Sequence, residues 1–150
     1  MRSKTRNIVR LSIMIGFISF FTAAEAQTVI QKLQSNRQTN HFARALAESD
    51  LDERLNNNGP FTLFAPSNSA FDKLSSAQQT NSSLLLNHVF TGMATERSLK
   101  AMSEVTCLSG LTISIKTDSQ NQLSVNKFRV VTSNIRASNG VIHIIEGVIK

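Results

Sequence analysis

Residues 61–71 read FTLFAPSNSAF, a short apolar run that meets a proline, a polar turn and a second group of apolar residues. The run Phe61–Ala65 is rich in aromatic residues and has a proline on each side, which is typical of a buried strand. In the turn, Ser67 or Asn68 offers a side-chain oxygen of the kind that caps the first turn of a helix. The stretch therefore predicts a buried strand that passes directly into a short helix carrying Phe71.

Helical spacing dominates the chain around this strand. Before it, apolar residues recur at intervals of three and four, as they do on one face of a helix. The three segments with this spacing hold Val29, Ile30 and Leu33; Phe42, Ala45 and Leu46; and Leu51 with Leu55. After the strand, Asn81 is placed to cap a helix that holds Leu84–Leu86. The segment Gly92–Met102 has no clear period.

The apolar period changes to two in the second half of the chain. Residues 111–116 alternate between apolar and polar side chains, which is typical of a half-buried strand. Short strands are expected at Leu123–Val125 and Phe128–Val131, and Val141–Ile149 is apolar on both faces, as a central strand would be. Helices mainly in the N-terminal half, followed by a mostly antiparallel sheet, predict an α+β fold.

The first 26 residues have the three parts of a secretory signal. They are a basic start with four cations, an apolar run from Leu11 to Phe21, and the small residues Ala24 and Ala26 before a cleavage point at Gln27. The alternative is a membrane anchor that stays in place, but the run has about half of the roughly 20 residues needed to cross a bilayer. We therefore expect a signal peptide at 1–26, a single domain at 27–150 and no transmembrane anchor.

The charge of the chain argues against binding to nucleic acid, and its cysteine content indicates a buried thiol. The formal charge of +6 falls to +3 in residues 27–150, because four of the 16 cations and one of the ten acidic residues lie in the signal. The remaining cations are scattered, so nucleic acid is not an expected partner. Cations such as Lys116, Lys127 and Arg129 could meet an acidic polymer, but a solvated polar face is the favoured explanation. The single cysteine, Cys107, lies between apolar residues and is expected to be buried.

Three segments, taken in order, resemble the fasciclin (FAS1) family. Phe61–Phe71, which includes Phe64, Ala65, Pro66, Ser67 and Asn68, looks like the first motif of that family. Leu84–Val89 looks like its central Tyr-His segment, and Ala137–Ile145, with Asn139, Gly140 and His143, looks like its closing motif. The resemblance implies a wedge-shaped β-sandwich packed with several α-helices. It also implies a secreted or periplasmic module that binds a cell-surface protein, a matrix protein or a polysaccharide.

Two positions depart from the family pattern and are the candidate binding residues. Where the family often has Tyr-His, this chain has Asn87-His88. Where some animal members have an Asp-Ile pair linked to integrin binding, this chain has Asn134-Ile135 and so lacks the carboxylate that a metal ion would prefer. Integrin recognition is therefore not expected.

The chemistry-bearing residues are better explained by structure than by catalysis. His88 and His143 lie among apolar residues and are expected to be buried with both ring nitrogens hydrogen-bonded. Ser67, Asn68 and Ser69 lack the surroundings of a serine nucleophile and are explained by helix capping. No spacing of histidines or cysteines fits a metal site, and no cofactor is expected. Asn81-Ser82-Ser83 fits the sequon for N-glycosylation.

The sequence thus favours a non-enzymatic, exported adhesion module. The alternatives are a periplasmic small-ligand-binding or enzymatic protein with a pocket near His88 or Ser67, and a purely structural protein of the cell envelope. A pocket with convergent polar groups would favour the first of these alternatives.

Overall fold

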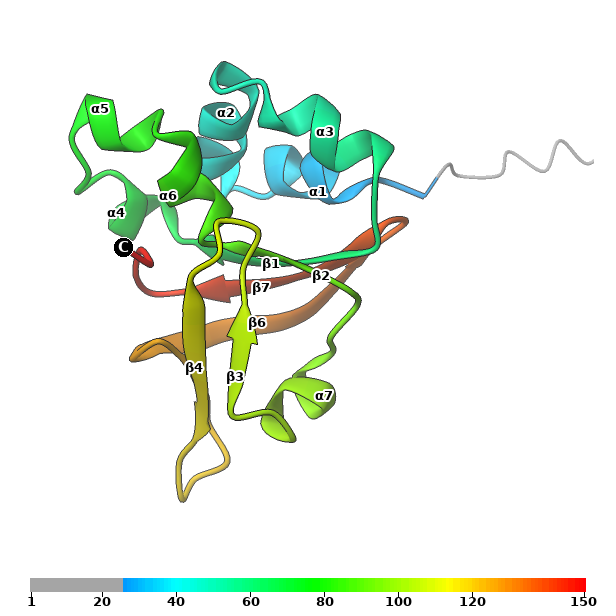
Figure 1. Cartoon of the computed structure of the whole chain (residues 1–150), viewed down its shortest axis with the longest axis vertical. Coiled ribbons are helices and arrows are strands. Elements are labelled where there is room, and N and C mark those ends of the chain that lie inside the picture. The colour runs from blue at the N-terminus through cyan, green and yellow to red at the C-terminus, as the bar shows by residue number, and fades with distance from the viewer. Residues whose placement is uncertain (1–25) are drawn as a thin grey trace, which may run out of the picture.

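A computed structural model describes residues 26–150, so the expected signal peptide lies almost entirely outside the described residues. The described chain folds into short helices and a mixed sheet (Figure 1). The helices are α1 (Val29–Ser35), α2 (Asn40–Glu48), α3 (Leu51–Asn57), α4 (Asn68–Phe71), α5 (Ser76–Gln79), α6 (Ser82–Leu86) and α7 (Glu96–Lys100). The strands are β1 (Phe61–Pro66), β2 (Val89–Thr91), β3 (Glu104–Thr106), β4 (Thr112–Thr117), β5 (Leu123–Val125), β6 (Phe128–Ala137) and β7 (Gly140–Ile145).

The strands form one seven-stranded sheet in the order β2-β1-β7-β6-β5-β4-β3. Every neighbouring pair is antiparallel except β1 and β7, which run parallel from Phe61↔Gly140 to Pro66↔Ile145. The sheet curls, and the Leu108 amide after β3 donates to the Val89 carbonyl of β2 at 2.8 Å. The two edges of the sheet therefore meet, and the sheet almost closes on itself.

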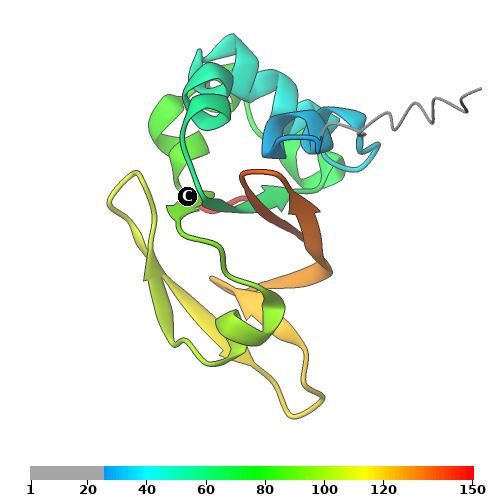
Figure 2. The same ribbon diagram turned by 90° about the vertical axis from the view of Figure 1, so that its right-hand side faces the viewer.

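Two apolar cores lie on opposite faces of β1 and β7. The first lies between these strands and the layer of helices α1–α6 that covers them (Figures 1 and 2), and it includes Phe42, Leu63 and Ile142. The second lies inside the curl of the sheet and includes Phe64 and Ile113. Strands β1 and β7 are buried along their whole length because each has a core on both faces. The arrangement confirms the predicted α+β fold and the wedge-shaped sandwich.

Local sequence explains how the short elements are held. Thr28, Ser75 and Thr95 cap α1, α5 and α7, and each side-chain oxygen accepts from a backbone amide of the first turn. Ser67 caps α4 in the same way, as its position after β1 predicts. At Gly140, an added Cβ would lie 2.2 Å from the Phe61 carbonyl oxygen. The close approach of β7 to β1 therefore requires glycine at this position.

Three sequence expectations need correction. The last strand ends at Ile145 rather than Ile149, and the backbone of Ile149 bonds instead to the side chains of Asn87 and His88. Strand β6 runs on to Ala137 through a polar segment, with irregular register between Val130 and Ile135. The segment without a clear period contains α7, whose one buried residue is Leu99.

Candidate functional site

Asn87 and His88 together hold the backbone of Ile149. The Asn87 amide nitrogen donates to the Ile149 carbonyl at 3.1 Å, and the Ile149 amide donates to His88 Nε2 at 3.0 Å. His88 Nδ1 lies 3.1 Å from the Leu84 carbonyl, so this nitrogen carries the ring proton. Both polar groups of Ile149 are satisfied by a pair of side chains 61 and 62 residues earlier in the chain.

His88 is fully buried, as the sequence predicts. Its ring packs against Phe42 with centroids 5.4 Å apart. Desolvation by burial lowers the pKa of His88 from its ordinary value of 6.5 to about 4. The imidazole is therefore neutral at pH 7 and has no exposed surface for a ligand, so the pair Asn87-His88 works here as a clamp on Ile149.

His143 and Asn134 form a second connected pair. His143 is fully buried, its Nε2 donates to the Ala94 carbonyl at 2.8 Å, and its Nδ1 accepts from the Asn134 amide at 3.3 Å. Burial lowers the pKa of His143 below its ordinary value. The Asn134 side chain in turn accepts from the Glu96 amide at 2.8 Å, which fastens the start of α7 to β6. Ile135 is half-buried against the helical core.

Asn134 also lies at the edge of a polar hollow beside α7. The hollow has a volume of about 360 Å³ and is lined by Glu96, Arg97, Lys100, Asn121 and Asn134. Hydrogen bonds from the Lys100 ammonium and the Ser133 hydroxyl lower the pKa of the Glu96 carboxyl below its usual value. Because the Asn134 oxygen is already used by the backbone, it offers little to a partner in this conformation.

Asn139 joins two helices and a neighbouring strand to the start of β7. Its side-chain oxygen accepts from the Val29 amide at 2.9 Å, and its nitrogen donates to the Leu55 carbonyl at 2.7 Å. Its backbone carbonyl accepts from the Phe61 amide at 2.9 Å. The closing motif of the sequence therefore positions α1, α3 and β1 relative to β7.

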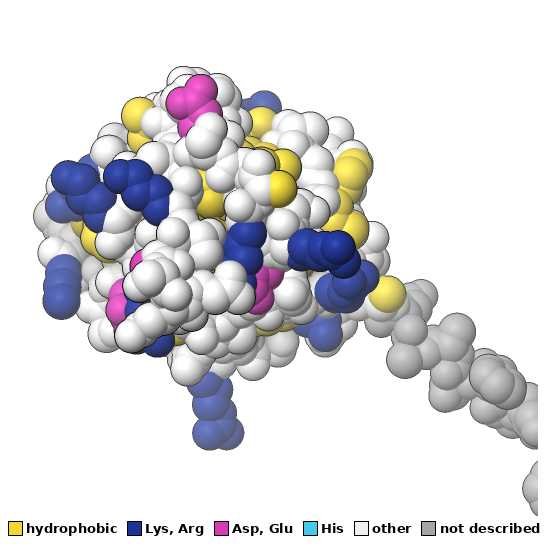
Figure 3. Space-filling view, turned by 90° about the horizontal axis from the view of Figure 1, so that it is seen from below, with side chains coloured by type: hydrophobic (Ala, Val, Ile, Leu, Met, Phe, Trp, Pro, Cys, Tyr) yellow, Lys and Arg dark blue, Asp and Glu magenta, His cyan; other side chains and the backbone are white. Residues whose placement is uncertain are grey.

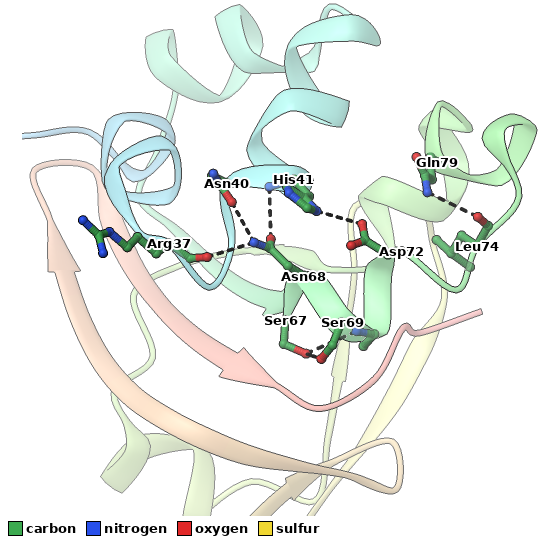
Figure 4. Close-up of polar contacts among 10 residues, drawn as sticks. Arg37, Asn40, His41, Ser67, Asn68, Ser69, Asp72, Leu74 and Gln79 are labelled. Atoms are coloured by element: carbon green, nitrogen blue, oxygen red, sulfur yellow. Dashed lines mark hydrogen bonds and ion pairs between the residues drawn. The ribbon is translucent and has the colours of Figure 1, made fainter.

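Asn68 performs the corresponding task after β1 (Figure 4). Its side-chain oxygen accepts from the His41 amide at 3.1 Å. Its side-chain nitrogen donates to the Arg37 carbonyl at 2.9 Å and to Asn40 Oδ1 at 2.7 Å. With every side-chain polar atom engaged, Asn68 holds the α1–α2 turn against the start of α4. The segment Ser67–Ser69 is therefore part of a rigid wall.

A His-Asp pair lies beside this wall, but the contacts do not extend it to a serine. His41 Nδ1 lies 2.7 Å from Asp72 Oδ1. The Ser67 and Ser69 hydroxyls lie 3.2 Å from each other, and the Ser67 oxygen accepts from the amide of Ala70. In Figure 4 the His41 ring points toward Asp72 and away from both serines. Within residues 26–150 no group of three or more His, Cys, Asp or Glu side chains is placed to hold a metal ion.

The surface between α4 and β6 is hollowed in two adjoining places that share Glu146. One, of about 470 Å³, is lined by Arg37, Gln38, Ser67, Asn68, Ser69, Val131, Ile144 and Glu146. The other, of about 220 Å³, is lined by Ala70, Lys73, Leu74, Phe128, Glu146, Gly147, Val148 and Lys150. We call the two together the α4–β6 groove. The sequence predicts that serines of this groove cap a helix, but it does not indicate which residues lie opposite them.

A β-bulge forms part of that far wall. Val130 pairs with Ile145, yet Thr132 pairs with the next residue of β7, Ile144, so Val131 is an extra residue on β6. Bulges re-aim a side chain and are frequent beside functional sites. Here the Val131 side chain is 45 % exposed although it is large and apolar. No signal in the sequence marks this register shift.

Three other predicted features fall elsewhere. Asn81 is exposed, and its side-chain oxygen caps α6 by accepting from the Leu84 amide at 3.0 Å. Cys107 is buried as expected, and desolvation raises the pKa of its thiol to about 11. Among the described residues, no helix has the length and apolar character that a bilayer span requires.

Known proteins resemble the chain along most of its length. The family model of the fasciclin domain matches residues 37–150 of this chain. Protein sll1483 of Synechocystis sp. is 35% identical over 136 residues, which cover 83% of this chain and 73% of that protein. Human periostin is 32% identical over 117 residues, which cover 72% of this chain and 14% of periostin.

A solved structure has the same fold. It is a FAS1 domain pair from the insect cell adhesion molecule fasciclin I, which superposes with a TM-score of 0.69 at 19% identity. The match covers 84% of this chain and 51% of the solved chain, so this chain spans about half of that structure.

Proposed function

Because the chain belongs to the fasciclin domain family, we propose that it is an exported adhesion module that binds a cell-surface or matrix component without catalysing a reaction. The observation that carries the proposal is the fasciclin domain match over residues 37–150. The N-terminal pattern of residues 1–26 supports export, and sequencing the N-terminus of the exported protein would test it. A first residue of Gln27 is expected, whereas an intact Met1 would contradict cleavage.

The structure supports binding at a rigid surface. The helical layer, the sheet and the last residues are tied together by the side chains of Asn68, Asn139 and His88. A surface held in this way loses little conformational entropy when it binds a partner. A small-ligand or enzymatic role at His88 is less well supported, because that ring has no exposed surface.

Adhesion can be tested directly with the purified protein. It would be immobilised at high density and offered intact cells and a panel of extracellular proteins and polysaccharides. Saturable binding that disappears when the domain is unfolded by heat is the expected result. If neither cells nor any extracellular component is retained at high density, the adhesion proposal fails.

A further inference from the structure

We propose that the α4–β6 groove binds an acidic polysaccharide, an inference that rests on the proposed adhesion function and names its partner class. The groove combines three kinds of group that such a chain requires. It has cations for carboxylates or sulfates, hydrogen-bonding side chains for hydroxyls, and exposed apolar side chains on which the C–H faces of sugar rings can pack.

The cations of the groove are placed in both of its halves. Arg37 lines one half, and Lys73 and Lys150 line the other. All three are exposed. Within residues 26–150 the ion pairs are His41–Asp72 and Lys100–Glu96, so none of the three cations is in an ion pair, although the Glu146 carboxylate lines the same groove. A polyanion with charges spaced along its length could contact both halves at once.

This local pattern is more informative than charge alone. On the face shown in Figure 3, Lys and Arg side chains stand in separate groups, with uncharged and acidic side chains between them. Cations elsewhere on the surface, such as Arg54 on α3 and Lys116 on β4, line neither half of the groove. The hollow beside α7 also has cations, but Lys100 there is paired with Glu96, whereas the three cations of the groove belong to none of the ion pairs of residues 26–150.

The polar groups of the groove match sugar hydroxyls. The Ser67 and Ser69 hydroxyls project from the wall that Asn68 fixes, and each can still donate or accept another hydrogen bond. Glu146, which both halves share, is exposed and accepts from hydroxyl groups when ionised. Val131, turned outward by the bulge, and the half-buried ring of Phe128 supply apolar contact.

An extended peptide fits this groove less well. Peptides that add a strand need a free sheet edge. Beside the groove, β6 is paired with β7, whose Ile144 lines the hollow, so this side of the strand offers no free edge. Peptide anchors also favour deep apolar pockets, whereas the apolar groups here are single exposed side chains beside polar ones. Binding of a peptide is therefore an alternative outcome of the test.

Binding of the purified protein to polygalacturonate tests the proposal, with dextran as the neutral polysaccharide. Arg37→Gln combined with Lys73→Gln is expected to weaken polygalacturonate binding by about tenfold, because each lost contact of an exposed cation is worth about a factor of three. Arg54→Gln combined with Lys116→Gln removes the same charge outside the groove and should change the affinity by less than about twofold. Val131→Glu should also abolish binding while the exposed position keeps the fold intact.

Each outcome separates this inference from the proposed function. Loss of polygalacturonate binding in the groove variants alone supports the inference. Equal weakening by both charge pairs would reveal nonspecific attraction and overturn it. If the protein retains cells but not polygalacturonate, the inference fails while adhesion stands. The same holds if cell binding survives Val131→Glu and requires protein on the cell surface. If neither is retained, both fail.

Discussion

Acid should destabilise the domain through His88. The ring is neutral and its Nε2 accepts from Ile149, so protonation in the folded state would remove that hydrogen bond. Burial lowers the folded pKa to about 4, against 6.5 for a free imidazole. The unfolded chain therefore binds the proton first as pH falls. His88 stabilises the fold fully above pH 6.5, and this stability is lost as pH falls toward 4. Because each unit of difference between the unfolded and folded pKa is worth about 1.4 kcal/mol, the loss is about 3 kcal/mol.

Urea unfolding followed by far-ultraviolet circular dichroism measures this loss, since the chain has no Trp or Tyr to serve as a fluorescent probe. The unfolding free energy would be determined at pH 7, 5.5 and 4.5 for the wild type, His88→Gln and His41→Gln. The His88→Gln variant should lose about 2 to 3 kcal/mol less than the wild type over this range. The His41→Gln variant removes a partly exposed histidine whose ring contacts a carboxylate, so it should not reduce the loss. Equal losses in all three proteins would refute the reasoning.

Three further predictions concern single contacts. Deleting Ile149 and Lys150 exposes the Asn87-His88 clamp and removes a buried side chain, so the melting temperature should fall by roughly 10 °C, whereas deleting Lys150 alone should change it little. Asn134→Ala should cost about 1 kcal/mol more in unfolding free energy than Asn121→Ala, because both residues have positive φ but only the first holds the start of α7. Cys107, whose thiol has a pKa of about 11, should react with iodoacetamide at pH 8 only when urea unfolds the domain, as mass spectrometry would detect.

The sequence predicted those elements whose local pattern and tertiary role agree. Strand β1 was predictable because its aromatic run is buried on both faces and ends at prolines. The burial of both histidines was predictable from their apolar neighbours. The end of β7 was not, because Val148 and Ile149 remain buried after the ladder stops, and an apolar run does not reveal whether its backbone bonds to a strand or to a side chain.

The α4–β6 groove could not be predicted for a related reason. Arg37 and Val131 are far apart in the sequence, yet both line the same hollow. Val131 is turned outward by a register shift that depends on how β6 meets β7. The local pattern of apolar residues predicts neither which distant segments become neighbours nor how their strands pair. The groove is therefore visible only in the assembled fold.

The hydrogen bond from Leu108 to Val89 has a consequence for how many copies can share one surface. Open strand edges recruit other chains and promote aggregation, and natural proteins avoid this by shortening or covering them. Here the edge strands β2 and β3 are each three residues long, and their ends are joined by this bond. Crowded copies of the domain would therefore have little backbone through which to polymerise, and a dense coat could remain a layer of separate molecules.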